Sequence, residues 1–425
     1  MTQPVRDPPA LITRDAAVLW HPYTQHALGE WPLAVDSARG AWLTLADGRR
    51  LLDAISSWWV NLHGHGHPAI VRTLAEQAAR LEHVLFAGCT HEPAVRLGER
   101  LVALANAGGA KLERVFYSDN GSTAVEVALK MAYQAAQQRG ETARTRFLAL
   151  RGAFHGDTLG AMAVGEPAGF HGVFRPLLAP VDFVRPDDLA DLERALETRG
   201  GEYAALIVEP LVQGAAGMRM HSSAFLSAAA RLCGVHGVLL VVDEVFTGFG
   251  RTGTIFAFEQ ARIAPDFVCL SKGLTAGCLP LAATLTTRAV FECFQGRGID
   301  RAFLHGHSFM ANPLACAVAN TSLDLLLDPV ATARRAVLAE RTRIHVAELS
   351  AHPALVRPRH LGLIGAADLR AGGAYGGDTS RHLRRAAAAR GVLLRPLGDV
   401  LYAVPPYCVT DDELATIYRV LSEIV

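Results

Sequence analysis

Two charged residues, Asp243 and Lys272, each follow a short apolar run that predicts a buried strand. Residues 237–242 read Gly-Val-Leu-Leu-Val-Val, and residues 267–270 read Phe-Val-Cys-Leu. Apolar runs that are rich in β-branched residues are typical of strands buried on both faces of a parallel sheet. Open α/β sheets bind ligands at the carboxyl ends of their strands. The sequence therefore predicts that Asp243 and Lys272 lie at a ligand site.

This pair of side chains suits the chemistry of pyridoxal phosphate. A lysine amine can bond covalently to the aldehyde carbon of that cofactor, and a carboxylate can pair with its pyridinium nitrogen so that the ring withdraws electrons. Isolated charged residues are more often exposed, with Asp243 as a turn residue and Lys272 in solvent. The pair by itself leaves both interpretations open.

The residues around this pair are similar to those of a known family. Residues 243–253 read Asp-Glu-Val-Phe-Thr-Gly-Phe-Gly-Arg-Thr-Gly, and Ser-Lys-Gly occupies residues 271–273. The chain thereby resembles the class III, or ω-amino-acid type, aminotransferases of fold type I, which use pyridoxal 5'-phosphate. The resemblance implies that Lys272 and Asp243 are catalytic and bind the cofactor, and it covers nearly the whole chain.

The resemblance also implies the fold class and the domains. Members are α/β proteins with a mainly parallel seven-stranded sheet between helices in a large domain, and a small α+β domain formed by both chain ends. We therefore expect an N-terminal arm and a segment of the small domain over residues 1–65. The large cofactor-binding domain is expected over residues 66–325, and the C-terminal small domain over residues 326–425.

Hydrophobic periodicity and turn signals predict further helices and strands along the chain. Asp47-Gly48 predicts a hairpin turn within residues 40–53. The other expected strands cover residues 115–117, 147–150, 204–208, 281–286, 362–366 and 400–404. The expected helices cover residues 68–84, 92–107, 331–349 and 381–390, with a last helix starting near residue 411.

A strand-to-helix turn provides a candidate anion site. Residues 118–123 read Ser-Asp-Asn-Gly-Ser-Thr, and Thr123 and Glu126 have the spacing of a capping box at a helix start. Free amide groups at a helix N-terminus bind anions such as phosphate. Many helices begin in this way without a ligand. The family resemblance assigns the phosphate contact to Gly121 and Ser122.

The resemblance assigns two further segments to the cofactor. In the family, the aromatic residue at the position of Phe154 stacks on the cofactor ring, and His155 follows it in the site. The segment Gly306-His307-Ser308 resembles a turn that crosses the interface of a dimer. There the hydroxyl at Ser308 binds the phosphate of the partner subunit's cofactor, with His307 beside it and Gly306 at the substrate. The resemblance thus implies a homodimer with shared active sites.

Two aromatic segments narrow the resemblance to one branch of the family. His21-Pro22-Tyr23-Thr24 and Ser57-Trp58-Trp59 are similar to segments of members that act in biotin synthesis. That branch transfers the amino group of S-adenosylmethionine to 8-amino-7-oxononanoate. An aromatic wall can stack on the adenine ring and cover the sulfonium cation of this donor. We expect Tyr23, Trp58 and Trp59 to bind substrate, with core packing of a tryptophan as the alternative.

The chain departs from that branch at two places and keeps its arginine. The branch is expected to carry tyrosine at position 154 and Pro-Thr at residues 307–308, where this chain has Phe154 and His-Ser. Phenylalanine can still stack and shape the substrate pocket, but it donates no hydrogen bond. The resemblance assigns the substrate carboxylate to Arg395, with Arg251 as a second candidate, because a guanidinium pairs bidentately with a carboxylate.

Composition and charge argue against several classes of function. The chain has 425 residues, 50% of them hydrophobic, and 41 basic side chains balance 41 acidic ones. This length allows a large core and more than one domain. A formal net charge of zero argues against a general nucleic-acid or membrane-surface binder. No signal peptide and no run of ~20 apolar residues is evident, so we expect a cytoplasmic protein.

The cysteine and histidine patterns predict neither disulfides nor a metal site. The seven cysteines are odd in number and form no Cys-x-x-Cys, which is typical of reduced thiols in a cytosolic protein. The densest histidine cluster, His63-Gly-His65-Gly-His67, lacks cysteine or carboxylate neighbours in the sequence. Because zinc sites usually combine such ligands, we expect no metal there.

Three alternative functions are compatible with parts of the sequence. Lysine could replace S-adenosylmethionine as the donor for the same acceptor, although the adjacent Trp58 and Trp59 favour the adenosyl donor. The enzyme could act on ornithine, 4-aminobutyrate or diamines, against which the segment at residues 21–24 argues. A regulator without turnover is the third. The presence of Lys272 and Asp243 and the absence of a basic helix-turn-helix argue against it.

Overall fold

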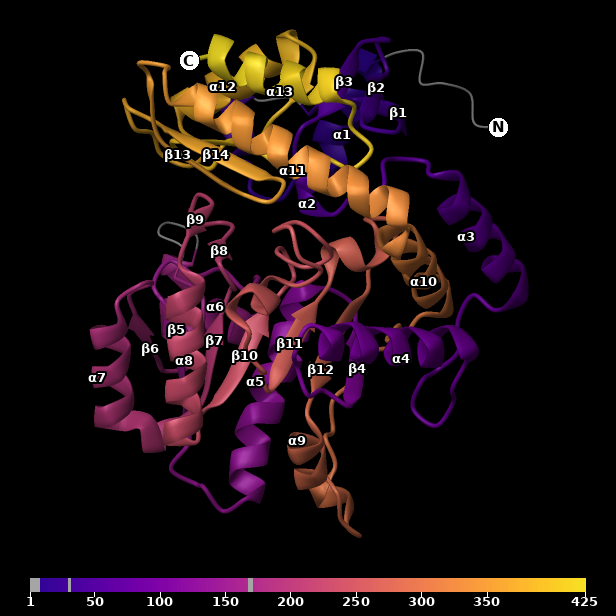
Figure 1. Cartoon of the computed structure of the whole chain (residues 1–425). Helices are drawn as coiled ribbons and strands as arrows, with labels where there is room; N and C mark the ends of the chain where they lie inside the picture. Colours follow the sequence, from indigo (N-terminus) through magenta and orange to yellow (C-terminus); the bar gives the residue numbers. More distant parts are fainter. Residues whose placement is uncertain (1–7, 30–31, 167–170) are drawn as a thin grey trace. The chain divides into compact units, whose positions relative to one another are not determined.

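The computed structural model describes residues 8–29, 32–166 and 171–425 (Figure 1). The chain forms two compact units. Unit 1 comprises Met1–Pro68 and Ala336–Val425, and unit 2 comprises Ala69–Arg335. The two chain ends thus share one unit, as the family resemblance implies. The units divide after residues 68 and 335. The domain boundaries expected from the sequence follow residues 65 and 325.

A seven-stranded sheet forms the centre of unit 2. Its strands are β4 (Arg114–Ser118), β5 (Arg146–Leu150), β6 (Val181–Val184), β7 (Tyr203–Val208), β10 (Leu239–Asp243), β11 (Phe267–Leu270) and β12 (Ala282–Thr286). The strand order is β4-β12-β11-β10-β7-β5-β6. The strands from β11 to β6 pair in parallel, and β12 is antiparallel to both of its neighbours. The predicted mainly parallel seven-stranded sheet is therefore confirmed.

Helices surround this sheet, and one of them packs over its middle (Figure 1). The helices of this part of the chain are α3 (Pro68–Arg80), α4 (Glu92–Ala107), α5 (Gly121–Gln138), α6 (Leu159–Ala163), α7 (Leu189–Arg199), α8 (Ser223–His236), α9 (Arg288–Cys293) and α10 (Pro313–Leu327). In α5, the fully buried Ala124 and Ala128 belong to one apolar cluster with Ile207, Val241 and Cys269 of the strands. Small alanine side chains let a helix pack closely on a sheet without leaving voids.

The parallel pairing of β10 and β11 brings Asp243 and Lys272 to the edge of the sheet where these two strands have their carboxyl ends. Asp243 is the last residue of β10 and pairs in register with Cys269 of β11. Lys272 follows three residues later, just beyond the end of β11. The predicted strand at residues 237–242 begins too early, because Gly237 ends α8 in the left-handed region with φ 64°.

The turn between β4 and α5 differs from its predicted form. The helix begins at Gly121, and Asn120 is its N-cap. The Asn120 side chain accepts from the backbone N–H of Thr123, and the Thr123 hydroxyl accepts from the backbone N–H of Asn120. Glu126 instead accepts from the backbone N–H of Gly160 at 2.6 Å. The predicted capping box of Thr123 and Glu126 is wrong, because the helix begins three residues earlier and Asn120 occupies the N-cap.

Unit 1 is built from two small sheets and the helices of both chain ends. Its elements are α1 (Pro8–Val18), β1 (Val35–Arg39), β2 (Trp42–Leu45), β3 (Arg50–Asp53), α2 (Ser56–Trp59), most of α11 (Pro329–Leu349), β13 (Leu355–Leu361), β14 (Ile364–Leu369), α12 (Asp378–Ala389), β15 (Val392–Leu393), β16 (Val400–Ala403) and α13 (Asp411–Glu423). The sheet orders are β1-β2-β3-β15 and β13-β14-β16. The predicted hairpin turn at residues 47–48 joins β2 to β3 and is confirmed.

A short parallel pairing joins the two chain ends inside unit 1. Strand β15 runs parallel to β3, with Val392 opposite Leu52 and Leu393 opposite Asp53. Both strands therefore end at the same edge of the sheet. The residues that follow Asp53 and the residues that follow Leu393 leave this edge side by side.

The helices of the described ranges were compared with the length and apolar composition needed to cross a membrane. Within residues 8–29, 32–166 and 171–425, no single helix meets both requirements. The bent pair of α10 and α11 meets them jointly, by length and composition only.

The close approach of α5 to the residues after β10 predicts opposite effects for two glycine substitutions. A Cβ added to Gly121 would lie 2.6 Å from Cγ1 of Val245, whereas one added to the exposed Gly234 of α8 meets nothing within 4 Å. Gly121→Ala should therefore destabilise the protein by about 1–3 kcal/mol through overpacking. Gly234→Ala should stabilise it by about 0.5–1 kcal/mol, because alanine favours a helix over glycine.

Thermal denaturation of the two variants and the parent protein tests this pair of expectations. The midpoint should fall for Gly121→Ala and rise for Gly234→Ala. An unchanged midpoint for Gly121→Ala would show that Val245 moves aside without cost.

Candidate active site

Lys272 is a half-buried residue two positions beyond the end of β11, in a backbone conformation that favours glycine. Its φ is 41°, and it opens a 3-10 turn over Lys272–Thr275. The preceding Ser271 hydroxyl donates to the carbonyl of Leu281 at 2.8 Å, which fixes the strand end. The Lys272 Nζ lies 5.7 Å from the ring centroid of Phe246. The amine is therefore held inside unit 2.

Burial changes the acid–base behaviour of this amine. Loss of water around Nζ lowers the pKa of Lys272 to about 8, although the carboxylates of Asp243 and Glu209 act in the opposite direction. The positive charge of Arg251 lowers the pKa further, and Arg251 itself is almost completely buried. With a pKa of about 8, roughly a tenth to a fifth of the amine is neutral near pH 7, far more than for an ordinary lysine, and the neutral form is the one that a nucleophile or general base requires.

Asp243 is oriented by a buried histidine. Nδ1 of His155 lies 2.7 Å from Oδ2 of Asp243, so the ring N–H donates to the carboxylate. Oδ1 of Asp243 accepts from the backbone N–H of Val245 at 3.0 Å. Nε2 of His155 is buried and has no hydrogen-bond partner among the described residues. The carboxylate thus has a fixed orientation at the carboxyl edge of the sheet.

A second buried carboxylate holds the loop that carries Phe154. Glu209, just after β7, accepts from the backbone N–H of Phe154 at 3.0 Å and of Gly214 at 2.9 Å. Burial raises the pKa of Glu209 to about 7. The Phe154 ring stacks on His171, with centroids 5.8 Å apart. Glu209 therefore sets the position of the loop whose Phe154 ring is expected at the cofactor.

The start of α5 offers a hydroxyl next to free helix amides. The Ser122 hydroxyl lies 2.7 Å from the Thr158 hydroxyl and accepts from the backbone N–H of Thr158 at 2.9 Å. Gly156 packs against Ser122 so closely that an added Cβ would overlap it, and its φ of 124° also requires glycine. Gly121 and Ser122 therefore sit in a compact turn that suits a phosphate.

The turn at residues 306–308 lies in unit 2 and is partly exposed. Nδ1 of His307 lies 2.8 Å from Oδ2 of Asp119, and its ring packs edge-on against His305 with centroids 5.0 Å apart. Gly306 and Ser308 are exposed. The contact with Asp119 ties this turn to the residues that precede α5.

The predicted substrate residues of unit 1 form a cluster around Trp58. The Tyr23 ring meets the Trp58 ring edge-on, with centroids 5.6 Å apart. The guanidinium carbon of Arg395 lies 4.5 Å from the centroid of the Trp58 ring, within the range of a cation–π interaction. Nη2 of Arg395 donates to the hydroxyl of Tyr375 at 3.3 Å. Unit 1 therefore presents a cation and aromatic faces together.

The two adjacent tryptophans have different environments. Trp59 is buried, and its Nε1 donates to the hydroxyl of Tyr402 at 3.3 Å. Trp58 is only partly buried. The four residues Ser56–Trp59 all have positive φ, between 46° and 72°, which costs on the order of 1–2 kcal/mol per residue. Such strain concentrates at functional sites.

Sequence reasoning did not identify His171, Tyr375 or Tyr402 as neighbours of the candidate residues. Tyr375 stands in a glycine-rich segment between β14 and α12, where nothing in the spacing marks it. The described residues hold no group of three or more His, Cys, Asp or Glu side chains placed to bind a metal ion. His65 of the histidine cluster instead lies 3.0 Å from Asp53.

Comparisons with known proteins agree with the motif around Asp243 and Lys272. The family model for aminotransferase class-III matches residues 23–425. Adenosylmethionine-8-amino-7-oxononanoate aminotransferase of Synechococcus elongatus is 49% identical over 423 residues, covering 96% of this chain and 98% of the relative.

Two solved structures are similar over nearly the full length. The crystal structure of adenosylmethionine-8-amino-7-oxononanoate aminotransferase from Methanocaldococcus jannaschii has a TM-score of 0.92 and 32% identity, covering 98% of this chain and 99% of that one. An amine transaminase from an uncultivated Pseudomonas species, solved in its PLP-bound form, has a TM-score of 0.90 and 30% identity, covering 96% and 98%. This chain belongs to the class III aminotransferase family.

Proposed function

We propose that this enzyme transfers the amino group of S-adenosylmethionine to 8-amino-7-oxononanoate in biotin synthesis, with pyridoxal 5'-phosphate as cofactor. The names of the relatives support these two substrates. The observation that carries the proposal is the desolvated Lys272 amine at the same sheet edge as the buried Asp243 carboxylate. When bound, pyridoxal phosphate supplies an electron-withdrawing ring that stabilises negative charge on the substrate carbon.

The residues of unit 2 fit this cofactor. Lys272 offers a buried amine of lowered pKa for the covalent bond. Asp243, oriented by His155, offers a carboxylate that keeps a ring nitrogen protonated. The amides at the start of α5 and the Ser122 hydroxyl offer a phosphate site. We assign these contacts to the cofactor, with Phe154 against the face of its ring.

Lys272 also moves the proton in this proposal. When its amine is not bonded to the cofactor, Lys272 would accept a proton from the donor carbon and later give it up again as a general acid. A pKa of about 8 suits both directions, because the amine then exchanges protons readily near neutral pH. Asp243 would assist this transfer through the cofactor, because its carboxylate keeps the ring nitrogen protonated and the ring electron-withdrawing.

The cluster of unit 1 is assigned to substrate. Arg395 pairs with the carboxylate of the oxo acid. The faces of Trp58 and Tyr23 suit the sulfonium cation and adenine ring of the donor. Trp59 and Arg251 are retained as further substrate residues, although Trp59 is buried against Tyr402; it would act through the position of Trp58.

We also propose a cytoplasmic homodimer in which Ser308 contributes to the partner subunit's cofactor site, beside Gly306 and His307. Phe309 and Leu304 support an interface here, since their side chains are 65% and 74% exposed next to this turn. Large apolar side chains that are exposed together mark interaction surfaces.

A half-reaction without acceptor tests the proposed donor. The cofactor-loaded protein is mixed separately with S-adenosylmethionine, lysine, ornithine and 4-aminobutyrate, and its visible absorbance is followed. We expect only S-adenosylmethionine to bleach the visible absorbance band of the bound cofactor. Among the four amines it alone combines a cation with a flat ring, and both can contact the aromatic side chains. Bleaching by lysine alone would change the donor. Bleaching by ornithine or 4-aminobutyrate would move the enzyme elsewhere in the family.

The lowered pKa of Lys272 predicts the pH dependence of cofactor attachment. The chain has three lysines, of which Lys111 and Lys130 are exposed. Only the neutral amine attacks an aldehyde, so attachment to the cofactor-free protein should accelerate as pH rises from 6.5 and level off above about 8. Borohydride trapping at set times, followed by peptide mapping, measures the rate of cofactor attachment at each lysine. Label on Lys111 or Lys130 at equal rates would contradict the assignment.

The role of Asp243 predicts a large loss of rate with little loss of structure. Asp243→Asn should lower kcat by about 10²–10³-fold, because a neutral amide does not stabilise the ring charge. Asp266→Asn is the matched control. Asp266 is a half-buried carboxylate that accepts from the backbone N–H of Leu240, at the end of β10 opposite to Asp243. It should lower the melting temperature with kcat nearly unchanged. Equal kcat losses in both variants would refute the role.

A further inference from the structure

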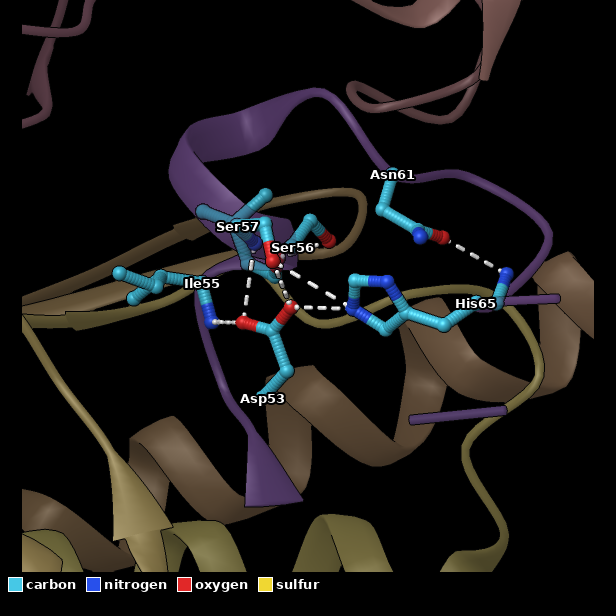
Figure 2. Close-up of polar contacts among 8 residues, drawn as sticks. Asp53, Ile55, Ser56, Ser57, Asn61 and His65 are labelled. Atoms are coloured by element: carbon cyan, nitrogen blue, oxygen red, sulfur yellow. Dashed lines mark hydrogen bonds and ion pairs between the residues drawn. The ribbon is translucent and has the colours of Figure 1, made fainter. Parts of the chain in front are cut away.

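One buried carboxylate converges on the left-handed turn that carries Trp58. Figure 2 shows Asp53 between this turn and the ring of His65. Oδ1 of Asp53 accepts from the backbone N–H groups of Ile55 at 3.2 Å and Ser57 at 2.9 Å. Oδ2 accepts from the Ser57 hydroxyl at 2.7 Å and from Nε2 of His65 at 3.0 Å. Four donors therefore converge on one fully buried side chain.

The turn depends on bonds from outside it. Its own backbone supplies bonds from Trp59 N–H to Ile55 C=O at 2.7 Å and from Val60 N–H to Ser56 C=O at 3.0 Å. Residues other than glycine rarely adopt positive φ at successive positions, because Cβ then crowds the following carbonyl. The backbone N–H of Ser57 points instead to Asp53. Without that carboxylate, the turn loses the acceptor that its conformation requires.

Both sides of this network are anchored in unit 1. His65 pairs its backbone with Gly40, with N···O distances of 2.9 and 2.8 Å. The Asn61 side chain accepts from the backbone N–H of Gly64 at 2.7 Å and shapes the loop that returns to His65. Asp53 ends β3. The carboxylate and its imidazole donor are thus held by separate backbone pairings.

The same carboxylate lies next to the strand that leads to Arg395. Asp53 pairs in parallel register with Leu393, and Arg395 follows two residues later. Trp58 and Arg395 therefore leave adjacent strand ends, and they meet with a guanidinium-to-ring distance of 4.5 Å. The direction of the Trp58 ring follows from the turn. Asp53 holds the turn through Ser57, and the Ser56 hydroxyl also anchors it by donating to the carbonyl of Val404 at 2.7 Å.

We propose that Asp53, with His65 as its donor, is a positioning residue that holds Trp58 against Arg395 for substrate binding. Asp53 touches neither substrate nor cofactor in this proposal and acts through Trp58. The expected effect on substrate KM rests on the proposed function. The position of the Trp58 indole does not rest on it, so that position can be measured without substrate.

The first measurement follows the indole of Trp58 directly. The protein is labelled with 5-fluorotryptophan, and its five ¹⁹F resonances are assigned by replacing each tryptophan with phenylalanine. Asp53→Asn puts an amide donor among four donors, so the Trp58 resonance should shift or broaden. The Trp42 resonance should not, since Trp42 is fixed by Glu413 and Arg50. An unchanged Trp58 resonance in folded Asp53→Asn would overturn the proposal.

His65 provides a second pair of variants that keep the carboxylate. His65→Ala removes one donor and leaves the backbone bonds of Asp53, so the Trp58 resonance should move in the same direction by less. His65→Gln can donate to Asp53 again and should return the resonance toward its original position. If Asp53→Asn does not fold, the His65 variants decide, and no movement in His65→Ala would refute the proposal.

Steady-state kinetics test whether the position serves binding. Asp53→Asn should raise KM for S-adenosylmethionine or 8-amino-7-oxononanoate about tenfold with a smaller change in kcat, the pattern of lost binding. The absorbance of the bound cofactor should not change. Asp368→Asn is the matched control, because Asp368 is a buried carboxylate of unit 1 held by Arg357 and Arg359. It should lower the melting temperature without moving the Trp58 resonance or KM.

The two proposals fail in different ways. If the parent protein does not transaminate these two substrates, the proposed function fails while the ¹⁹F measurement still decides the role of Asp53. If the Trp58 resonance moves but KM stays equal to that of the parent protein, the position does not serve binding and the inference is overturned. If Asp368→Asn changes the resonance or KM as much as Asp53→Asn does, the effect is general destabilisation, which also overturns it.

Discussion

The chemistry of unit 2 depends on the burial of one amine beside two carboxylates. Water would keep Lys272 charged, and burial lowers its pKa to about 8. The carboxylates that limit this shift are themselves fixed, Asp243 by His155 and Glu209 by two backbone amides. Lys272, Asp243 and Glu209 all lie at or just beyond the carboxyl ends of strands. The rigid parallel sheet is thus the reason that a flexible lysine can act at one place.

Much of unit 2 could be predicted because its strands are buried on both faces. Continuous apolar runs then end abruptly in the residues that do chemistry, as at Asp243 and Lys272. Errors occurred at element ends, where local bonds decide. Asn120 took the capping position expected of Thr123, and Gly237 ended a helix instead of beginning a strand. Capping side chains a few positions apart, such as Asn120 and Thr123, can each begin a helix, and periodicity does not rank them.

Unit 1 was less predictable, because its cluster depends on contacts between distant segments. Tyr23, Trp58 and Arg395 were expected as substrate residues from the family resemblance, and the fold brings them together. Nothing in the spacing predicted that Ser56–Trp59 would form a left-handed turn, since the four residues individually disfavour it. The carboxylate that stabilises the turn and the strand opposite it come from different parts of the chain. A polar network of this kind carries no periodic signal.

The pairing of β3 with β15 has a consequence for how the chain is made. Residues 52 and 53 find their strand partners only at residues 392 and 393, near the far end of the chain. During synthesis, the N-terminal hairpin therefore leaves the ribosome long before its sheet can be completed. Unit 2 is continuous in sequence and can fold in that interval, since domains fold as units during synthesis. Closing this loop of 340 residues (392 − 52) is then a late topological step, and a loop of this length carries a large cost in chain entropy.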